Sequence, residues 1–149
     1  MAGMALWLLC RDRRAFLRYG WSVAAGLTLS IAIFFIWPSG QNLRPAALPE
    51  NDLASVLLRA IYAADTNTNV LPSMHVVGTL AAVRAAFEPK CFDKKLPRWA
   101  VAALGLMINA STVLVKQHSL LDLLAGLALY LLIYPFIYVL PDKLLRRKA

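Results

Sequence analysis

A long uncharged stretch near the N-terminus constrains the fold most. Residues 20–37 contain no charged side chain, and about 20 apolar residues in a helix are needed to cross the ~30 Å hydrocarbon core of a bilayer. Trp21 and Trp37 bracket the stretch, as aromatic belts do at both membrane interfaces. No small-residue cleavage site follows it, so we interpret it as a retained spanning helix and not as a cleaved signal peptide.

The composition supports a membrane protein. Of 149 residues, 60% are hydrophobic and only 16% are charged, whereas a soluble domain has roughly 45–50% apolar and about 25% charged residues. The length allows one domain over residues 1–149. The net charge of +8 comes from short basic clusters beside apolar segments, which is typical of membrane flanks and not of a nucleic-acid-binding face. We therefore expect the bilayer as a partner and no nucleic acid.

Further apolar segments complete the predicted fold. Residues 99–117 and 119–140 are long enough to span, the second with a kink near Pro135. Ser73 is the expected N-cap of a shorter helix that runs to about residue 87, whose many small residues favour a central position in lipid. Residues 4–9 and 52–64 are too short to cross. The prediction is an all-α polytopic membrane bundle, with about four spanning helices plus one or two short interfacial or re-entrant helices.

The basic residues predict an orientation. Residues 1–19, residues 84–98 and the tail from residue 142 carry 4, 5 and 4 Lys or Arg residues, which is 13 of the 16 in the chain. Basic residues remain on the cytoplasmic side, so both termini are expected there, in a plasma or inner membrane. His75, His118 and Asp122 then lie at the opposite, outer face.

These three residues are candidates for chemistry. Asp122 follows His118 by four residues, which places both on one helix face, and a carboxylate orients an adjacent imidazole and makes it more basic. His75 lies in the first turn of its helix, where unpaired N–H groups attract anions. Ser73 adds a hydroxyl donor unless it caps the helix.

Simpler interpretations stay open at this point. Either histidine alone can be an interfacial polar residue, and the His118–Asp122 pair can be a structural hydrogen bond. A metal site of His75, His118, Asp122 and Asp65 lacks a compact ligand motif, and Cys10 and Cys91 have no ligand at metal spacing. We therefore expect no metal and no cofactor.

Two motifs resemble those of the type-2 phosphatidic acid phosphatase (PAP2) superfamily over roughly residues 38–135. Pro72-Ser73-Met74-His75 is similar to the family's Pro-Ser-Gly-His motif. Ser111, His118 and Asp122 fall at the intervals of its Ser-Arg-x5-His-x3-Asp motif, with Thr112 in place of Arg. Arg44-Pro45 matches the end of the Lys-x6-Arg-Pro motif, with Trp37 at the Lys position. The departures are similar to those of the branch that holds inositolphosphorylceramide-synthase-like and other phosphotransferase members.

The resemblance implies a metal-independent phosphatase or phosphotransferase with assigned roles. His118 resembles the nucleophile that becomes a phosphohistidine, Asp122 the residue that orients it, and His75 the acid that protonates the leaving group. The implied substrate-binding residues are Arg44, Ser73, Lys116, Ser111 and Thr112, where Lys116 stands in for the missing Arg.

The prediction is a membrane lipid phosphatase that acts on a lipid phosphate or a prenyl diphosphate. One alternative is a phosphotransferase that passes a phosphoryl-bearing head group to an alcohol. The other is a catalytically silent protein that binds lipid. The sequence does not determine the particular lipid or the oligomeric state.

Overall fold

The computed structural model describes residues 1–45, 47–48 and 52–146, in which helices joined by loops make up the regular secondary structure. An isolated bridge between Gly40 and Thr68 is the one strand-like feature of those residues. The elements are α1 (Ala2–Arg11), α2 (Arg13–Ile36), α3 (Leu53–Ala64), α4 (Met74–Ala86), α5 (Lys95–Leu114), α6 (Leu120–Tyr134), the π-helix η1 (Pro135–Val139) and α7 (Leu140–Arg146). The predicted all-α class is confirmed. Parts of the predicted loop and basic tail, residues 46, 49–51 and 147–149, lie outside the described residues.

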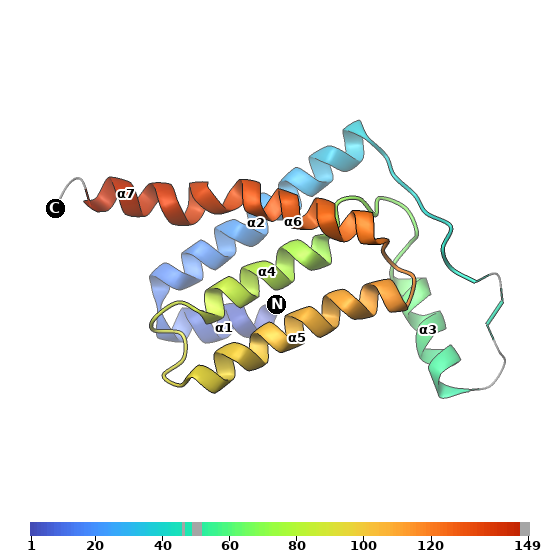
Figure 1. Ribbon diagram of the computed structural model, residues 1–149, viewed down its shortest axis with the longest axis horizontal. Helices are drawn as coiled ribbons and strands as arrows, with labels where there is room; N and C mark the ends of the chain where they lie inside the picture. Colours follow the sequence, from blue (N-terminus) through green and yellow to red (C-terminus); the bar gives the residue numbers. More distant parts are fainter. Residues whose placement is uncertain (46, 49–51, 147–149) are drawn as a thin grey trace.

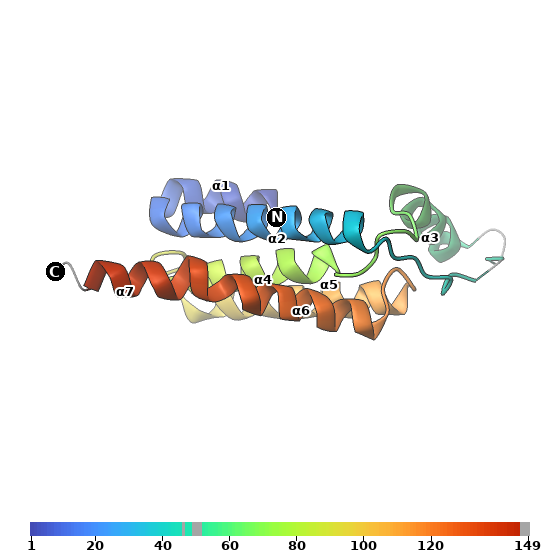
Figure 2. The same ribbon diagram turned by 90° about the horizontal axis from the view of Figure 1, so that it is seen from above.

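Helix α4 is the centre of the bundle. It packs against α2, α5 and α6, and the four helices lie side by side in both views (Figures 1 and 2). Small residues permit this close packing. A Cβ built on Gly26 of α2 would lie 2.3 Å from Val77 Cγ1, and one on Gly126 of α6 would lie 2.7 Å from the Ser73 carbonyl oxygen. The predicted central position of this helix is confirmed.

Helix α1 folds back along α2, as Figure 2 shows. Its Leu8 is fully buried in the core. Tyr19 Oη donates to the Met1 carbonyl at 3.1 Å, and Trp7 Nε1 donates to the Cys91 carbonyl at 2.9 Å. The sequence predicts a short surface segment over residues 4–9. The structure shows a helix packed into the bundle with one face outward.

Two helices are long and apolar enough to cross a membrane. They are α2 and the continuous helix from Leu120 to Lys143, each of 24 residues. Only 22% and 28% of their most apolar windows are buried, whereas a soluble core helix is mostly buried. Such exposed apolar surface, with Phe35 85% and Ile36 83% exposed, indicates a membrane protein.

The predicted count of four spans is not confirmed. Helix α4 has 13 residues, which is about 20 Å at 1.5 Å per residue. Helix α5 is not among the two that meet the length and hydropathy criteria. The first span also begins earlier than predicted, because the Asp12 carboxylate accepts from the amides of Arg14 and Ala15 and caps α2. Near Pro135, where the sequence predicts a kink, the helix changes to η1.

The bundle has two distinct ends (Figure 1). The C-termini of α2 and α5, the N-termini of α4 and α6, and helix α3 gather at one end. We call it the histidine end, because His75 and His118 lie there. The opposite end holds the α1–α2 junction, the α4–α5 connection and α7. We call it the arginine end, because it carries Arg14, Arg18 and Arg84.

Candidate active site

The histidine end brings the two histidines into direct contact. His75 Nδ1 lies 3.2 Å from His118 Nε2, and the rings meet edge to face with centroids 5.3 Å apart. His118 is buried at 6% exposure, while His75 is exposed. A contact between two ring nitrogens requires one to donate and the other to accept. The pair therefore holds one proton between a buried and an accessible imidazole.

Asp122 lies behind His118, but not as the sequence predicts. His118 precedes the helix and does not share its face, because Ser119 is the N-cap of α6. Asp122 Oδ2 accepts the Ser119 amide at 2.7 Å, and Ser119 Oγ accepts the Asp122 amide at 3.3 Å. This capping box fixes the carboxylate. Its Oδ2 is 3.6 Å from His118 Nδ1, which is too long for a hydrogen bond and leaves that nitrogen buried without a partner.

Ser73 occupies the N-cap position of α4 without capping it. Its side chain makes no cap hydrogen bond, is 0% exposed, and its Oγ has no partner. Its amide instead donates to the Asp122 carbonyl at 3.1 Å, which ties the start of α4 to the first turn of α6. A buried hydroxyl without a partner costs roughly 1–3 kcal/mol. The hydroxyl is therefore available to a ligand.

A tight turn after α5 delivers His118. Lys116 has φ 57, and its amide donates to the Val113 carbonyl at 3.0 Å. The Gln117 amide donates to the Thr112 carbonyl at 2.9 Å. These two bonds define a Schellman motif, in which Gly usually occupies the left-handed position. Lys116 thus has a backbone role in this turn, and its side chain is exposed.

A strap from α3 and its flanking loops holds this turn. Gln117 Nε2 donates to Asp65 Oδ2 at 2.8 Å, and Tyr62 Oη donates to the Val115 carbonyl at 2.8 Å. Arg44 donates to the carbonyls of Tyr62 at 3.1 Å and Asp65 at 2.6 Å, and its guanidinium lies 4.4 Å from the Tyr62 ring centroid. These contacts make Arg44 a positioning residue for the His118 turn.

The remaining predicted ligands are engaged within α5. Ser111 Oγ donates to the Ile108 carbonyl and Thr112 Oγ1 to the Asn109 carbonyl, both at 2.8 Å. The structure therefore brings together His75, His118, Asp122 and Ser73. The Ser111 and Thr112 side chains bond within α5, and Thr112 meets the site only through its carbonyl, which accepts the His118 amide at 3.1 Å. In the described part of the chain, no group of three or more His, Cys, Asp or Glu side chains is arranged to hold a metal ion.

Burial governs the charge of His118, which lies in the loop outside both spanning helices. Desolvation lowers its pKa from the ordinary value of 6.5, and the neighbouring His75 lowers it further. Asp122 and Asp65 act in the opposite direction without reversing the shift. His118 is therefore neutral near pH 7, which is the state in which a ring nitrogen has a free lone pair.

Sequence reasoning missed the strap and the capping box. The bonds of the strap join residues 18 to 53 positions apart, such as Gln117 and Asp65, and no local pattern encodes them. The capping box did leave a signal, since Ser119 is followed three residues later by the acidic Asp122 just before an apolar run.

Comparison with known proteins supplies the family. The sequence model of the PAP2 superfamily matches residues 1–136, which is most of the chain and includes every residue of the histidine end described above. The match does not distinguish the inositolphosphorylceramide-synthase-like branch from others. Searches of curated proteins and of solved structures found no match. On the strength of the family match, this chain belongs to the PAP2 superfamily.

Proposed function

We propose that the chain is a membrane phosphatase that cleaves a lipid phosphate or a prenyl diphosphate through a phosphohistidine on His118. Membership of the superfamily supports phosphatase or phosphotransferase activity. One observation carries the mechanism. A buried imidazole has its Nε2 3.2 Å from an exposed imidazole and its Nδ1 3.6 Å from a fixed carboxylate.

The positions suggest unequal roles for the two histidines. If the Nδ1 proton of His118 faces Asp122, its Nε2 carries the lone pair and accepts from His75 Nδ1. The first step is attack of His118 Nε2 on phosphorus, with cleavage of the bond to the leaving oxygen. His75 gives its proton to that oxygen. In the second step water attacks the phosphorus, His75 takes the water proton, and the P–N bond breaks to release phosphate.

Substrate entry requires the histidines to separate. Reacting atoms start about 3–3.5 Å apart and a general acid lies within about 2.6–3.2 Å of the leaving oxygen, so a phosphoryl group between the nitrogens needs about 6 Å or more. The observed 3.2 Å is a closed arrangement. His75 is the exposed partner and can rotate outward, while the buried His118 stays fixed by its turn.

The phosphate oxygens have a seat at the start of α4. The amides of the first helical turn are donors without intrahelical partners, and the free Ser73 hydroxyl adds another. Lys116 lies two residues before His118, and its side chain is exposed. We propose that its ammonium group also contacts the phosphate. Arg44 acts through the strap and not by direct contact.

The proposed setting is a cell membrane with the histidine end at the outer face and both termini cytoplasmic. The opposite end of the bundle carries Arg14, Arg18 and Arg84, and the positive-inside rule favours the cytoplasmic side for such residues. The exposed apolar residues of α3, such as Leu53 at 75%, suit a helix lying at the outer interface.

Transfer to an alcohol remains the second candidate. The closed site excludes bulk water from a 6% exposed His118, which would favour an acceptor that binds in the place of water. Product analysis with an added alcohol distinguishes a new phosphate ester from free phosphate.

Phosphate release by purified protein tests the proposal. The screen covers lipid monophosphates and prenyl diphosphates, each with and without a chelator. Replacement His118→Ala should lower kcat by about 10⁴-fold or more, as expected for a nucleophile, while the protein still inserts. The matched control Leu120→Ala changes a 68% exposed side chain two residues from His118, keeps both histidines and should retain most activity. Equal turnover by His118→Ala would rule out the mechanism, and no release from any substrate would favour the silent lipid-binding protein.

A further inference from the structure

A groove at the arginine end lies far from the histidines. It has a volume of about 660 Å³ and runs between the start of α2 and the η1–α7 segment. Its polar residues are Arg13, Arg14 and Arg18, and its apolar wall includes Trp21 and Phe136. No Asp or Glu is among its lining residues. The groove therefore has a positively charged part near the start of α2 and an apolar part beside Trp21 and Phe136.

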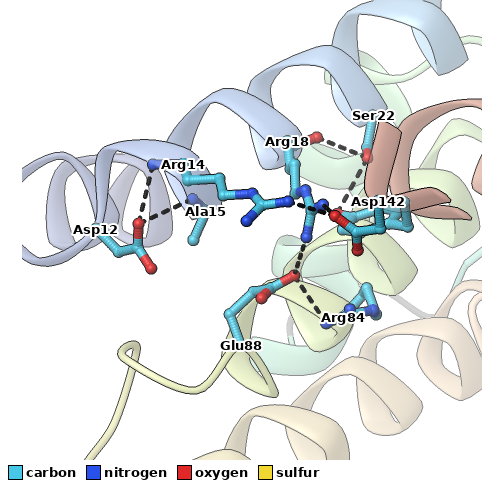
Figure 3. A network of polar contacts seen from close by, with 9 residues as sticks. Asp12, Arg14, Ala15, Arg18, Ser22, Arg84, Glu88 and Asp142 are labelled. Atoms are coloured by element: carbon cyan, nitrogen blue, oxygen red, sulfur yellow. Dashed lines mark hydrogen bonds and ion pairs between the residues drawn. The ribbon is translucent and has the colours of Figure 1, made fainter. Parts of the chain in front are cut away.

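The arginines differ in how firmly they are held (Figure 3). Arg18 is 12% exposed and pairs with Glu88 and Asp142. Arg14 also pairs with Asp142, but its side chain is 58% exposed. Arg13 is exposed and has no ion pair with any residue that the structure describes. Arg18 is thus a fixed part of the wall. Arg13 is free to turn toward an anion, and the 58% exposed Arg14 can do so by leaving the Asp142 carboxylate that it shares with Arg18.

The apolar part of the groove is open to the surroundings. Leu17 is 47%, Trp21 67% and Phe136 63% exposed. Trp21 follows Arg13 by eight residues, which is about 12 Å along a helix. Both helices that flank the groove are long and apolar enough to span a membrane, so its apolar part faces acyl chains when they are inserted. The charged part then lies at head-group depth.

We propose that this groove binds one anionic phospholipid of the leaflet at the arginine end. Arg13 and Arg14 contact the phosphate, because guanidinium groups match phosphate oxygens in a bidentate geometry. One acyl chain covers Leu17, Trp21 and Phe136. The lipid is a ligand that the histidines do not touch, so the site is separate from the proposed phosphatase chemistry.

Clustered positive charge alone also attracts anionic lipid, so the test needs a control of equal charge. Lys94 and Lys95 are exposed at the same end of the bundle and do not line the groove. Replacing them with Gln removes the same two charges. If the groove forms a specific site, loss of the two arginines should weaken lipid binding more than loss of the two lysines. If only the overall positive charge attracts lipid, both double variants should lose binding equally.

Native mass spectrometry of the full chain in detergent, with equal amounts of phosphatidylglycerol and phosphatidylcholine, measures the bound lipid. We expect a preference for phosphatidylglycerol that falls by roughly 30-fold in Arg13→Gln/Arg14→Gln, about fivefold for each basic residue. Lys94→Gln/Lys95→Gln should lose less than about twofold. Equal losses in both double variants, or no preference in the unmodified chain, would overturn the proposal.

Two further experiments test whether the double variant has simply lost its fold and whether the groove binds phosphate without acyl chains. Arg13→Gln alone disrupts no described ion pair, and should lower the preference by about fivefold. Glycerol 3-phosphate lacks acyl chains and should not displace the lipid at millimolar concentration. Unchanged binding by Arg13→Gln, or full displacement by glycerol 3-phosphate, would contradict a lipid held by both halves of the groove.

Discussion

The two ends of the bundle differ in whether their buried polar groups lie beside a charged partner. At the arginine end Glu88 is 7% exposed, and its Oε1 lies 3.1 Å from Arg84 and 3.5 Å from Arg18. These are ion pairs without full hydrogen-bond alignment, but the charges compensate one another. At the histidine end, His118 Nδ1 and Ser73 Oγ are buried without a hydrogen bond, as Glu88 Oε1 also is, but the one carboxylate oxygen near His118 Nδ1, Asp122 Oδ2 at 3.6 Å, faces an imidazole that is neutral near pH 7.

The difference separates stability from chemistry. The ion pairs of Arg18 and Arg84 at the arginine end join α2, α4 and α7, so they hold helices together. Unpaired groups at the histidine end cost about 1–3 kcal/mol each, and in the proposed function a phosphate ligand would satisfy them. Changes at the histidine end should therefore alter turnover, and changes at the arginine end should alter stability.

The largest effect in this comparison is expected at His75. Replacement His75→Asn removes the proton donor and keeps a side chain that can accept hydrogen bonds. We expect kcat to fall by about 10²–10⁴-fold, with little change in the thermal unfolding midpoint because the side chain is exposed. A substrate whose leaving group needs no proton should recover most of the rate of leaving-group release, while kcat stays low because His75 also takes the water proton in the second step. Failure of such a substrate to rescue the variant would assign His75 a structural role.

The arginine end should give the reverse result. Replacement Glu88→Gln leaves two guanidinium groups without their shared carboxylate, and should lower the free energy of unfolding by roughly 2 kcal/mol. Turnover per folded molecule should not change. The control is Asp93→Asn, which breaks the exposed Arg11–Asp93 pair and should cost less than about 1 kcal/mol. A tenfold drop in kcat of Glu88→Gln with an unchanged thermal unfolding midpoint would contradict the assignment of stability to the arginine end and turnover to the histidine end.

Asp122 links the capping box to the charge of His118. Replacement Asp122→Asn keeps an acceptor for the Ser119 amide and removes the negative charge. We expect kcat to fall roughly tenfold, which is about 1.4 kcal/mol. Because the Asp122 carboxylate raises the pKa of His118, its loss lowers that pKa, and the acid limb of the kcat/KM profile moves to lower pH. Ser119→Ala, which weakens only the cap, should leave the limb in place; a shift toward higher pH in Asp122→Asn would refute the assignment.

The smallest effects are expected at Lys116, where charge and backbone can be separated. Lys116→Gly relieves the left-handed conformation and should stabilise the fold by about 1 kcal/mol. Lys116→Gln keeps that conformation and removes the charge. If the ammonium contacts the substrate, both variants should raise KM by about threefold. An unchanged KM in both would remove Lys116 from the substrate contacts.

The sequence predicted the helices better than the site. The short helix predicted over residues 52–64 is α3 (Leu53–Ala64), which starts after Asp52, whose carboxylate accepts from the Ser55 amide at 2.8 Å. Helix α4 begins one residue after Ser73, as expected. Local patterns suffice there because caps and apolar spacing act within one or two turns.

The details of the site depend on contacts that no local pattern encodes. An i, i+4 spacing placed His118 and Asp122 on one helix, but the turn at Lys116 and the cap at Ser119 keep His118 outside it. No glycine marks that turn, so its left-handed residue left no signal. Arg44 matches a phosphate-binding motif in sequence, yet the fold directs its guanidinium to the carbonyls of Tyr62 and Asp65.

The central claim is that His118 carries the phosphoryl group during turnover. Rapid acid-free quenching of the purified chain with a substrate that it turns over, followed by mass spectrometry of the peptide containing residues 117–119, measures this directly. We predict an acid-labile phosphoryl group on His118 that forms at the rate of leaving-group release and accumulates in His75→Asn with a substrate that needs no leaving-group proton. Phosphate release at full rate with no label on His118, or with the label on His75, would contradict it.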